Sequence, residues 1–180
     1  YGPASIAGVT HVLDGGNFIN IPHFGRFLVL DISGHTKIHL AFYHFADKVL
    51  FCSDCLFSAG CGRIFDGDAL SFYHSIQKIS LLADDTILCP AHEYTLSNLQ
   101  FALAVEPNNQ DSKDYQQQCL LLRQQQRPTL PTLLGKEKLF NPFLRCHLLV
   151  KEISDLTHEN CQTGAQGFAA LRRYKNHWQS

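Results

Sequence analysis

Lys48-Val49-Leu50-Phe51-Cys52-Ser53-Asp54 is the stretch that decides the fold class. Its β-branched, aliphatic and aromatic residues form a short run between turn residues, and such a run predicts a buried strand. Residues 40–45 form a similar run across the two-residue turn Ala46-Asp47, so we expect the two segments to pair as antiparallel strands. The strand over residues 48–52 then leads into a turn that carries the ionisable Asp54.

Two further strands are predicted upstream of this pair. They cover residues 9–13 and 24–32 and flank the turn Asp14-Gly15-Gly16-Asn17. Downstream, apolar residues recur at helical spacing and predict a helix over residues 68–83, with Asp68 as a plausible N-cap. A strand over residues 86–89 follows. The first half of the chain is therefore expected to be an α/β unit in which one helix lies on a sheet.

From residue 95 onward the pattern changes to helix. Residues 95–106 predict a helix that ends before Pro107, because the residue before a proline disfavours helical geometry. The apolar face of this helix is expected to hold Leu96, Leu99 and Leu103. Residues 111–126 predict a second helix, with a buried stripe of Tyr115, Cys119 and Leu122. We therefore expect the C-terminal third to be all-helical and to form an appended subdomain.

Composition limits the partners and the location. The 180 residues are 45% hydrophobic, which is enough to build a core. Their formal net charge is −1, so the overall electrostatic potential of the protein does not favour binding to nucleic acid or to a membrane surface. No apolar run approaches the roughly 18 residues that cross a bilayer, and no leader-like segment is present. Seven scattered cysteines do not resemble a secreted disulfide framework. The sequence thus predicts a soluble cytoplasmic protein with reduced thiols.

The start of the sequence carries its own expectation. The chain contains no methionine and opens with Tyr1-Gly2-Pro3. We therefore expect it to be a fragment, or to have lost its front.

Three ionisable residues share one placement, a few positions beyond a predicted buried strand. They are His35, Asp54 and His92, and each lies in a turn with small residues. Side chains in such turns project past the end of a sheet, where α/β proteins assemble ligand sites. Two imidazoles and a carboxylate suit zinc or a comparable divalent ion. The alternative is that all three are ordinary turn residues with satisfied hydrogen bonds.

Five short segments occur in an order and spacing that match one known family. They are Ser33-Gly34-His35-Thr36, Phe51-Cys52-Ser53-Asp54-Cys55-Leu56-Phe57, Gly60-Cys61-Gly62-Arg63, Ala91-His92-Glu93-Tyr94-Thr95 and Asn141-Pro142-Phe143-Leu144-Arg145. On these segments the chain resembles glyoxalase II, the hydroxyacylglutathione hydrolase family of the metallo-β-lactamase superfamily. The likeness runs from Tyr1 to Trp178 and corresponds to the C-terminal two-thirds of the family.

The resemblance implies an α/β fold, namely an incomplete metallo-β-lactamase-like αβ/βα sandwich with a C-terminal helical subdomain. Residues 1–94 would be the C-terminal portion of the metallo-β-lactamase-like domain. Residues 95–180 would be the helical hydroxyacylglutathione hydrolase C-terminal subdomain.

The resemblance also implies a centre of two divalent ions, with zinc expected and iron or manganese possible. His35 would bind one ion, Asp54 would bridge both, and His92 would bind the other. The remaining family ligands come from a Thr-His-x-His-x-Asp-His motif upstream, and the 180 residues contain no such motif. The only histidines before His35 are His11 and His23. We therefore expect hydrolysis by this chain alone to be impaired.

The implied activity is hydrolysis of the thioester of S-2-hydroxyacylglutathione, such as S-D-lactoylglutathione, in methylglyoxal detoxification. A metal-bridged hydroxide would attack the thioester, and Asp54 would be the catalytic carboxylate of this site. The implied partner is the small-molecule glutathione thioester, bound by a monomer. The residues implied to bind glutathione are Arg63, Tyr94, Arg172 and Lys175. For the last two, the alternative is a solvated face of a terminal helix.

Several positions depart from the family pattern and keep other hypotheses open. Ser53 and Cys55 flank the bridging aspartate where glycine and threonine are usual, and other departures are Ser33, Ile38 and Phe65. Cys52 and Cys55 also form a C-x-x-C motif, which is compatible with a zinc or redox site. The second class of function is thus a catalytically silent chain, or a structural zinc or glutathione-binding module.

Overall fold

The structure is a computed structural model that describes residues 1–178. It contains one six-stranded sheet, in the order β1-β2-β3-β4-β7-β8, and a separate two-stranded hairpin. The sheet strands are β1 (Phe18–Ile21), β2 (Gly25–Asp31), β3 (Leu40–His44), β4 (Val49–Ser53), β7 (Ile87–Pro90) and β8 (Thr132–Leu133); the hairpin strands are β5 (Leu56–Phe57) and β6 (Gly60–Cys61). The helices are α1 (Ala69–Ser80), α2 (Thr95–Val105), α3 (Gln110–Gln124), α4 (Leu134–Phe140), α5 (Val150–Thr157) and α6 (Gly164–His177).

The deciding stretch forms β4, as predicted. Strand β4 pairs with β3 in antiparallel register, and Phe42 faces Phe51. Helix α1 then crosses over the sheet and returns the chain to β7, which runs parallel to β4. Asp68 caps α1 by accepting hydrogen bonds from the backbone N–H groups of Leu70 and Ser71. The helix-on-sheet unit expected from the sequence is therefore confirmed.

The predicted strand over residues 9–13 is wrong. In that segment only Val12 makes an isolated bridge, to Gly2, and the partner of β2 is β1. The loop between β1 and β2 is short, and His23 and Gly25 adopt positive φ angles in it, so the two strands pair as a tight hairpin. The expected strand still contributes to packing, because Leu13 lies in an apolar cluster with strand residues.

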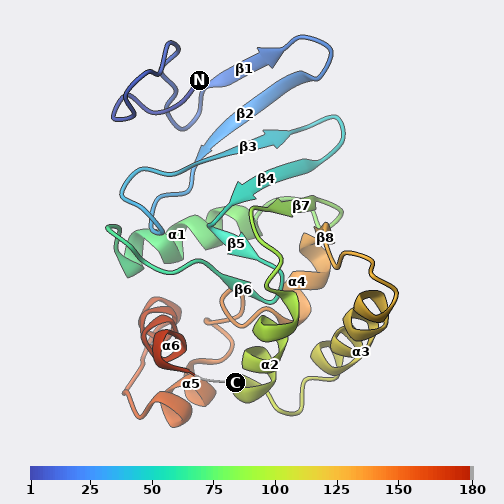
Figure 1. Ribbon diagram of the computed structural model, residues 1–180. Helices are drawn as coiled ribbons and strands as arrows, with labels where there is room; N and C mark the ends of the chain where they lie inside the picture. The colour runs from blue at the N-terminus through green and yellow to red at the C-terminus, as the bar shows by residue number, and fades with distance from the viewer. Residues whose placement is uncertain (179–180) are drawn as a thin grey trace.

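The C-terminal third is not all-helical. Strand β8 pairs with β7 in antiparallel register and forms an edge of the sheet. Figure 1 shows the helices α2 to α6 gathered at this end of the sheet. Helix α2 is buried on more than the predicted face, since Phe101, Ala102 and Val105 are buried while Leu103 is only half-buried. Leu122 of α3 is also half-buried, whereas Tyr115 and Cys119 are buried as expected.

One apolar core joins the two halves of the chain. Its largest cluster includes Leu50 and Leu88 from the sheet, Phe72 from α1, and Phe168 and Leu171 from α6. The boundary expected near residue 94 therefore crosses a shared core. The division into two domains stays a prediction.

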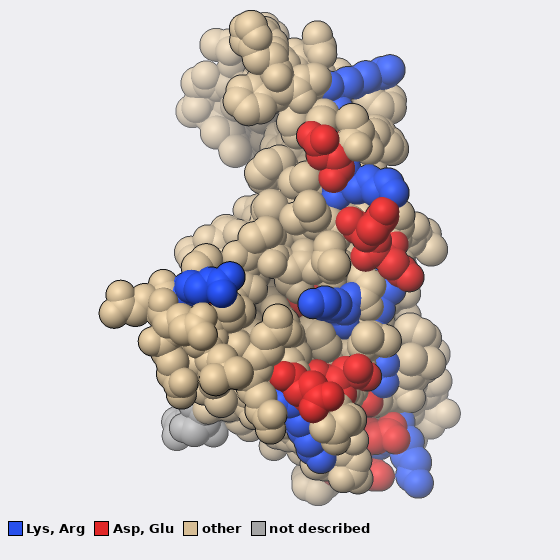
Figure 2. All heavy atoms as spheres, turned by 90° about the vertical axis from the view of Figure 1, so that its right-hand side faces the viewer, with Lys and Arg blue, Asp and Glu red and all other residues tan. Residues whose placement is uncertain are grey.

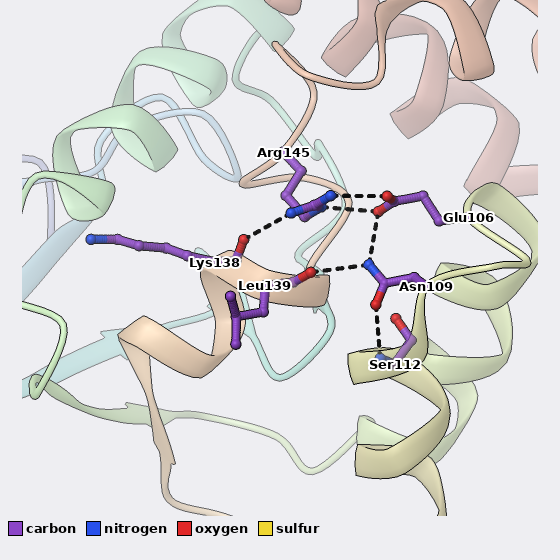
Figure 3. A network of polar contacts seen from close by, with 6 residues as sticks. All are labelled: Glu106, Asn109, Ser112, Lys138, Leu139 and Arg145. Carbon is purple, nitrogen blue, oxygen red and sulfur yellow. Dashed lines mark hydrogen bonds and ion pairs between the residues drawn. The ribbon is translucent and has the colours of Figure 1, made fainter.

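A polar network fixes the corner between α2, α3 and α4 (Figure 3). Arg145 donates two hydrogen bonds to the carboxylate of Glu106, at 2.9 and 3.0 Å, and a third to the backbone carbonyl of Lys138. Asn109 donates to the carbonyl of Leu139 and caps α3 by accepting from the backbone N–H of Ser112. The half-buried ion pair thus has its hydrogen bonds satisfied, which limits its desolvation cost.

Surface charge is mixed in sign. Figure 2 shows acidic and basic side chains interspersed along the face that it draws. Two of the surface ion pairs are Lys48 with Asp85 and Lys138 with Asp84. Within residues 1–178 no helix is long and apolar enough to cross a membrane.

Candidate functional site

The three strands that precede His35, Asp54 and His92 run in the same direction. Strand β2 is antiparallel to β3, β3 is antiparallel to β4, and β4 is parallel to β7. The carboxyl ends of β2, β4 and β7 therefore lie together along one side of the sheet. This carboxyl edge, where the strands end, is distinct from the edge strand β8. The three turns that follow these strands lie at that edge, as the sequence predicted.

A cavity of about 590 Å³ opens at this edge. All seven residues singled out from the sequence line it: His35, Asp54, Arg63, His92, Tyr94, Arg172 and Lys175. The rest of the lining is Phe57, Cys61, Gly62, Phe65, Ser97 and Asn98. The structure thus brings residues from the sheet edge, the β5–β6 hairpin, α2 and α6 to one place.

One imidazole lies beside the carboxylate, and the other is fixed by a backbone contact. The Nε2 atom of His92 is 3.3 Å from Oδ1 of Asp54. The Nδ1 atom of His35 is 2.6 Å from the backbone carbonyl oxygen of Arg63. Because a carbonyl only accepts, Nδ1 of His35 carries the proton and donates, which leaves Nε2 with its lone pair. His35 is thereby held in one tautomer.

Gly62 is required for this packing. A Cβ atom at Gly62 would lie 2.0 Å from the backbone oxygen of Asp54 and 2.9 Å from Nδ1 of His35. Both distances are too short for a carbon atom. The hairpin can therefore approach the two candidate ligands only because residue 62 has no side chain.

These residues fit part of a divalent-metal site. Histidines that bind metals usually donate their second ring N–H to a carbonyl or a carboxylate, as His35 does here. Asp54 and His92 are both partly exposed toward the cavity and can turn oxygen and nitrogen donors to an ion. Within residues 1–178, however, no three or more His, Cys, Asp or Glu side chains form a group that could hold a metal. His35, Asp54 and His92 thus line one cavity but do not together form such a group in the described chain.

Two cationic side chains of α6 form another part of the lining. Arg172 is 3% exposed and donates from Nη1 to the carbonyls of Cys61 at 3.1 Å and Gly62 at 3.2 Å. Its Nε atom is buried and has no partner among the described residues. Lys175 donates to Oδ1 of Asn98, and its Nζ lies 4.8 Å from the ring centre of Phe101. The alternative of a solvated helix face is thus wrong for Arg172, and Lys175 is half-buried and hydrogen-bonded.

The surroundings of this pair lower the pKa of Lys175 and include no carboxylate partner among the described residues. Burial first, and the charge of Arg172 second, lower the pKa of Lys175 to about 7, while Cys61 opposes the shift. Within residues 1–178 neither cation forms an ion pair with a carboxylate. A buried and a half-buried cation without an anion are costly, and an anionic ligand would relieve that cost.

Aromatic rings complete the walls. Tyr94 stacks on His92 with ring centres 5.2 Å apart and meets Phe57 edge to face at 5.3 Å. Phe65 lies edge-on to His35 at 4.9 Å and is 74% exposed. Arg63 is also exposed, so its guanidinium is accessible at the mouth.

Sequence reasoning missed Asn98. It is 4% exposed on α2, donates to the carbonyl of Ser58 at 2.9 Å and accepts from Lys175. Its signal was a polar residue beside Leu99 on the apolar face of a predicted helix. Such a residue needs a buried partner.

The C-x-x-C hypothesis finds little support in the environment of its thiols. Cys52 and Cys55 are fully buried, and Cys52 donates to the carbonyl of Leu56. Burial raises the pKa of Cys52 to about 12 and that of Cys55 well above its ordinary value. Thiols in such surroundings stay protonated, whereas metal binding and redox chemistry use the thiolate.

Comparison with known proteins gives matches along the whole chain. The family model described as "Metallo-beta-lactamase superfamily" matches residues 2–92, and "Hydroxyacylglutathione hydrolase C-terminus" matches residues 93–178. The hydroxyacylglutathione hydrolase of Aliivibrio salmonicida (strain LFI1238) is 47% identical over 169 residues, covering 93% of this chain and 66% of that protein. The hydroxyacylglutathione hydrolase of Photorhabdus laumondii is 46% identical over 178 residues, covering 98% of this chain and 70% of that protein.

A solved structure supports the fold. The crystal structure of ETHE1 from Myxococcus xanthus matches with a TM-score of 0.59 at 19% identity, and the match covers 96% of this chain and 56% of that one. The chain thus spans about two-thirds of the length of these two curated relatives and just over half of this structural neighbour.

Proposed function

The chain belongs to the hydroxyacylglutathione hydrolase family of the metallo-β-lactamase superfamily, and from this membership and the geometry of the cavity we propose that it hydrolyses thioesters of glutathione. The proposed substrate is an S-2-hydroxyacylglutathione such as S-D-lactoylglutathione, and the products are glutathione and a 2-hydroxy acid. In the cell this reaction would serve methylglyoxal detoxification.

The observation that carries the proposal is a pair of cations on α6, of which Arg172 is buried and Lys175 is half-buried. Arg172 and Lys175 face the cavity without a carboxylate partner in the described chain, and Nε of Arg172 is an unused buried donor. Glutathione carries two carboxylates. Arginine offers a carboxylate a planar fork of donors, and lysine adds a point charge. We assign these two residues to one carboxylate of glutathione.

The other proposed substrate contacts are Tyr94 and Arg63. Tyr94 is held by stacking on His92 and by edge contact with Phe57, so its hydroxyl is presented at a fixed place beside the candidate ligands. Arg63 is exposed and can meet a second carboxylate near the mouth. The thioester would then lie between the cations and the pair formed by Asp54 and His92.

The family is one of divalent-metal hydrolases, and we propose zinc as the ion, with iron or manganese as the alternatives. Of two such ions, His35 would help to hold one and His92 the other, and Asp54 would contribute to both. When bound, such ions lower the pKa of water and polarise the carbonyl that is attacked. Nδ1 of His35 keeps its proton and donates it to the hydrogen bond with the Arg63 carbonyl, so this ring keeps the same nitrogen turned to the cavity. The departing group is a thiolate, whose ordinary pKa of about 8.5 lets it leave without a strong acid.

Further assignments complete the proposal. Residues 1–94 would supply the candidate metal ligands together with Arg63 and Tyr94, and residues 95–180 would supply Arg172 and Lys175. The protein would act as a monomer in the cytoplasm, which agrees with its seven free cysteines.

A second candidate is glutathione binding without hydrolysis. It is favoured by one finding, that the described residues include no group of three metal-binding side chains. The two candidates share the cation pair and differ in the metal centre.

The test compares two proteins. One is the 180-residue chain, and the other is the same chain preceded by the upstream segment of the Photorhabdus laumondii relative. Both are loaded with zinc and assayed for cleavage of S-D-lactoylglutathione. We expect turnover only from the extended protein, and we expect its Asp54→Asn variant to lose it. Metal-dependent turnover by the 180 residues alone would refute the argument about missing ligands. An inactive extended protein that still binds glutathione would favour the second candidate.

A further inference from the structure

We infer that Glu137, which does not line the cavity, is a positioning residue for the glutathione site. Its carboxylate holds the β5–β6 hairpin, and the hairpin in turn holds Arg172 and, through Asn98, Lys175. This inference rests on the proposed function and extends it to a residue on α4. It assigns a role to a buried carboxylate that the proposed function does not use.

The carboxylate of Glu137 is completely buried and accepts four hydrogen bonds. Oε1 accepts from the hydroxyls of Ser58 at 2.7 Å and Thr132 at 3.0 Å. Oε2 accepts from the backbone N–H of Ala59 at 2.7 Å and the amide of Asn141 at 3.0 Å. Ser58 and Ala59 form the turn between β5 and β6. Two of the four hydrogen bonds that Glu137 accepts therefore come from residues of this turn.

Asn141 strengthens the same attachment. Its Nδ2 also donates to the carbonyls of Phe57 and Gly60, both at 3.1 Å. The amide thus bridges Glu137 to the two residues that flank the turn. The hairpin is held by side chains of α4 and of the residue that follows it, 78 to 84 positions away in the sequence.

The hairpin passes this constraint to the cavity in two directions. The carbonyl of Ser58 accepts from Asn98, whose oxygen accepts from Lys175. The carbonyls of Cys61 and Gly62 accept from Nη1 of Arg172. Arg172 is thus held by the hairpin directly, and Lys175 is held through Asn98. The hairpin therefore sets the positions of the two groups proposed to bind a carboxylate.

The chemistry of the four donors explains why a carboxylate stands here. The N–H of Ala59 and the NH2 group of Asn141 can only donate, and a carboxylate can only accept. Burial raises the pKa of Glu137 to about 6, against the four hydrogen bonds, which lower it. At pH 7.5 the group is still ionised, so all four bonds are satisfied together. A glutamine would present an NH2 group to two of the donors.

The test measures two quantities at pH 7.5 on the full chain and its variants. One is the dissociation constant for reduced glutathione by calorimetry, and the other is the NMR resonance of the Arg172 side-chain N–H. Glu137→Gln keeps the volume and removes the charge. Ser58→Ala and Thr132→Val form a matched pair, since each removes one hydroxyl bond to the same oxygen but only Ser58 belongs to the hairpin. Glu106→Gln is a control that weakens another partly buried interaction, the ion pair between Glu106 and Arg145.

We expect Glu137→Gln to weaken glutathione binding by roughly ten-fold, the loss that follows from one charge-assisted hydrogen bond. Ser58→Ala should weaken it several-fold, and both variants should shift the Arg172 resonance. Thr132→Val and Glu106→Gln should lower thermal stability while leaving the affinity and the resonance unchanged. An unchanged affinity in Glu137→Gln, or equal effects of Ser58→Ala and Thr132→Val, would overturn the inference.

Failure of the proposed function gives a different pattern. If the unaltered chain does not bind glutathione, the substrate assignment is wrong. The positioning role is then judged by the Arg172 resonance alone, which needs no ligand. Should Glu137→Gln not fold, the matched pair decides, because each of its members removes a single hydroxyl.

Discussion

Replacing Lys175 with methionine should make the protein more stable and a poorer binder of glutathione. Methionine has a similar length and no charge, so it fills the same space over Phe101 without the desolvation cost. The pKa of Lys175 is lowered from 10.5 to about 7, chiefly by burial. Each pKa unit corresponds to about 1.4 kcal/mol, so burying the protonated amine costs roughly 4–5 kcal/mol at most.

The net gain is smaller because the lysine also makes favourable contacts. Its hydrogen bond to Asn98 and its position over Phe101 together contribute about 2 kcal/mol. Lys175→Met should therefore raise the free energy of unfolding by about 2–3 kcal/mol near neutral pH. The same change should weaken glutathione binding, because one of the two cations that line the cavity is lost.

The sign of the pH dependence follows from linkage. Between pH 7 and 10.5 the unfolded chain keeps a proton on Lys175 that the native state has released. Stability of the unaltered protein therefore rises with pH over this window, and the penalty is complete below pH 7. Urea denaturation near pH 6, 8 and 10 measures the difference between the two proteins. The reasoning is refuted if the methionine variant is no more stable at pH 6, or if its advantage does not shrink toward pH 10.

Three other changes have expected outcomes. Gly62→Ala should destabilise the fold by about 1–3 kcal/mol and abolish zinc uptake by the extended protein, measured by metal analysis, because the added carbon meets the backbone of Asp54 at 2.0 Å. Glu137→Gln should make the loss of stability toward acid pH steeper. Burial raises the pKa of Glu137 from 4.5 to about 6, so the native state of the unaltered protein takes up that proton first and gains about 2 kcal/mol as the pH falls from 6 to 4.5. The variant lacks this gain, which urea denaturation at the two pH values measures. Asp68→Ala should cost about 1 kcal/mol of thermal stability by removing the cap of α1, with an unchanged dissociation constant for glutathione; a change in that constant would contradict the view that this cap is only structural.

The sheet edge could be predicted because it depends on local pattern. The run that forms β4, the capped helix α1 and the strand β7 each carry their own signal, and a parallel return places Asp54 and His92 at the same edge. His35 joins them because an even number of antiparallel steps separates β2 from β4. The gathering of these three side chains around one cavity therefore follows from strand direction alone.

Other features depend on contacts that no local pattern records. The segment over residues 9–13 has the composition of a strand, but the tight β1–β2 hairpin takes the available edge of β2. Strand β8 has two residues and exists only because β7 offers it an edge. Glu137 lies between Lys136 and Lys138, which is typical of a solvated helix, yet tertiary packing buries it completely. Its role depends on donors that lie far away in the chain.

The attachment of the β5–β6 hairpin to α4 has a consequence for synthesis of the protein. Glu137 follows Ala59 by 78 residues, which a ribosome adds in about 4–16 s at roughly 5–20 residues per second. During that interval the β5–β6 turn has been synthesised, but the carboxylate of Glu137 does not yet exist. Water must therefore satisfy the N–H of Ala59 and the hydroxyl of Ser58. The cavity can therefore take its final form only after α4 has been made, and ligand recognition must be a late event in the maturation of this chain.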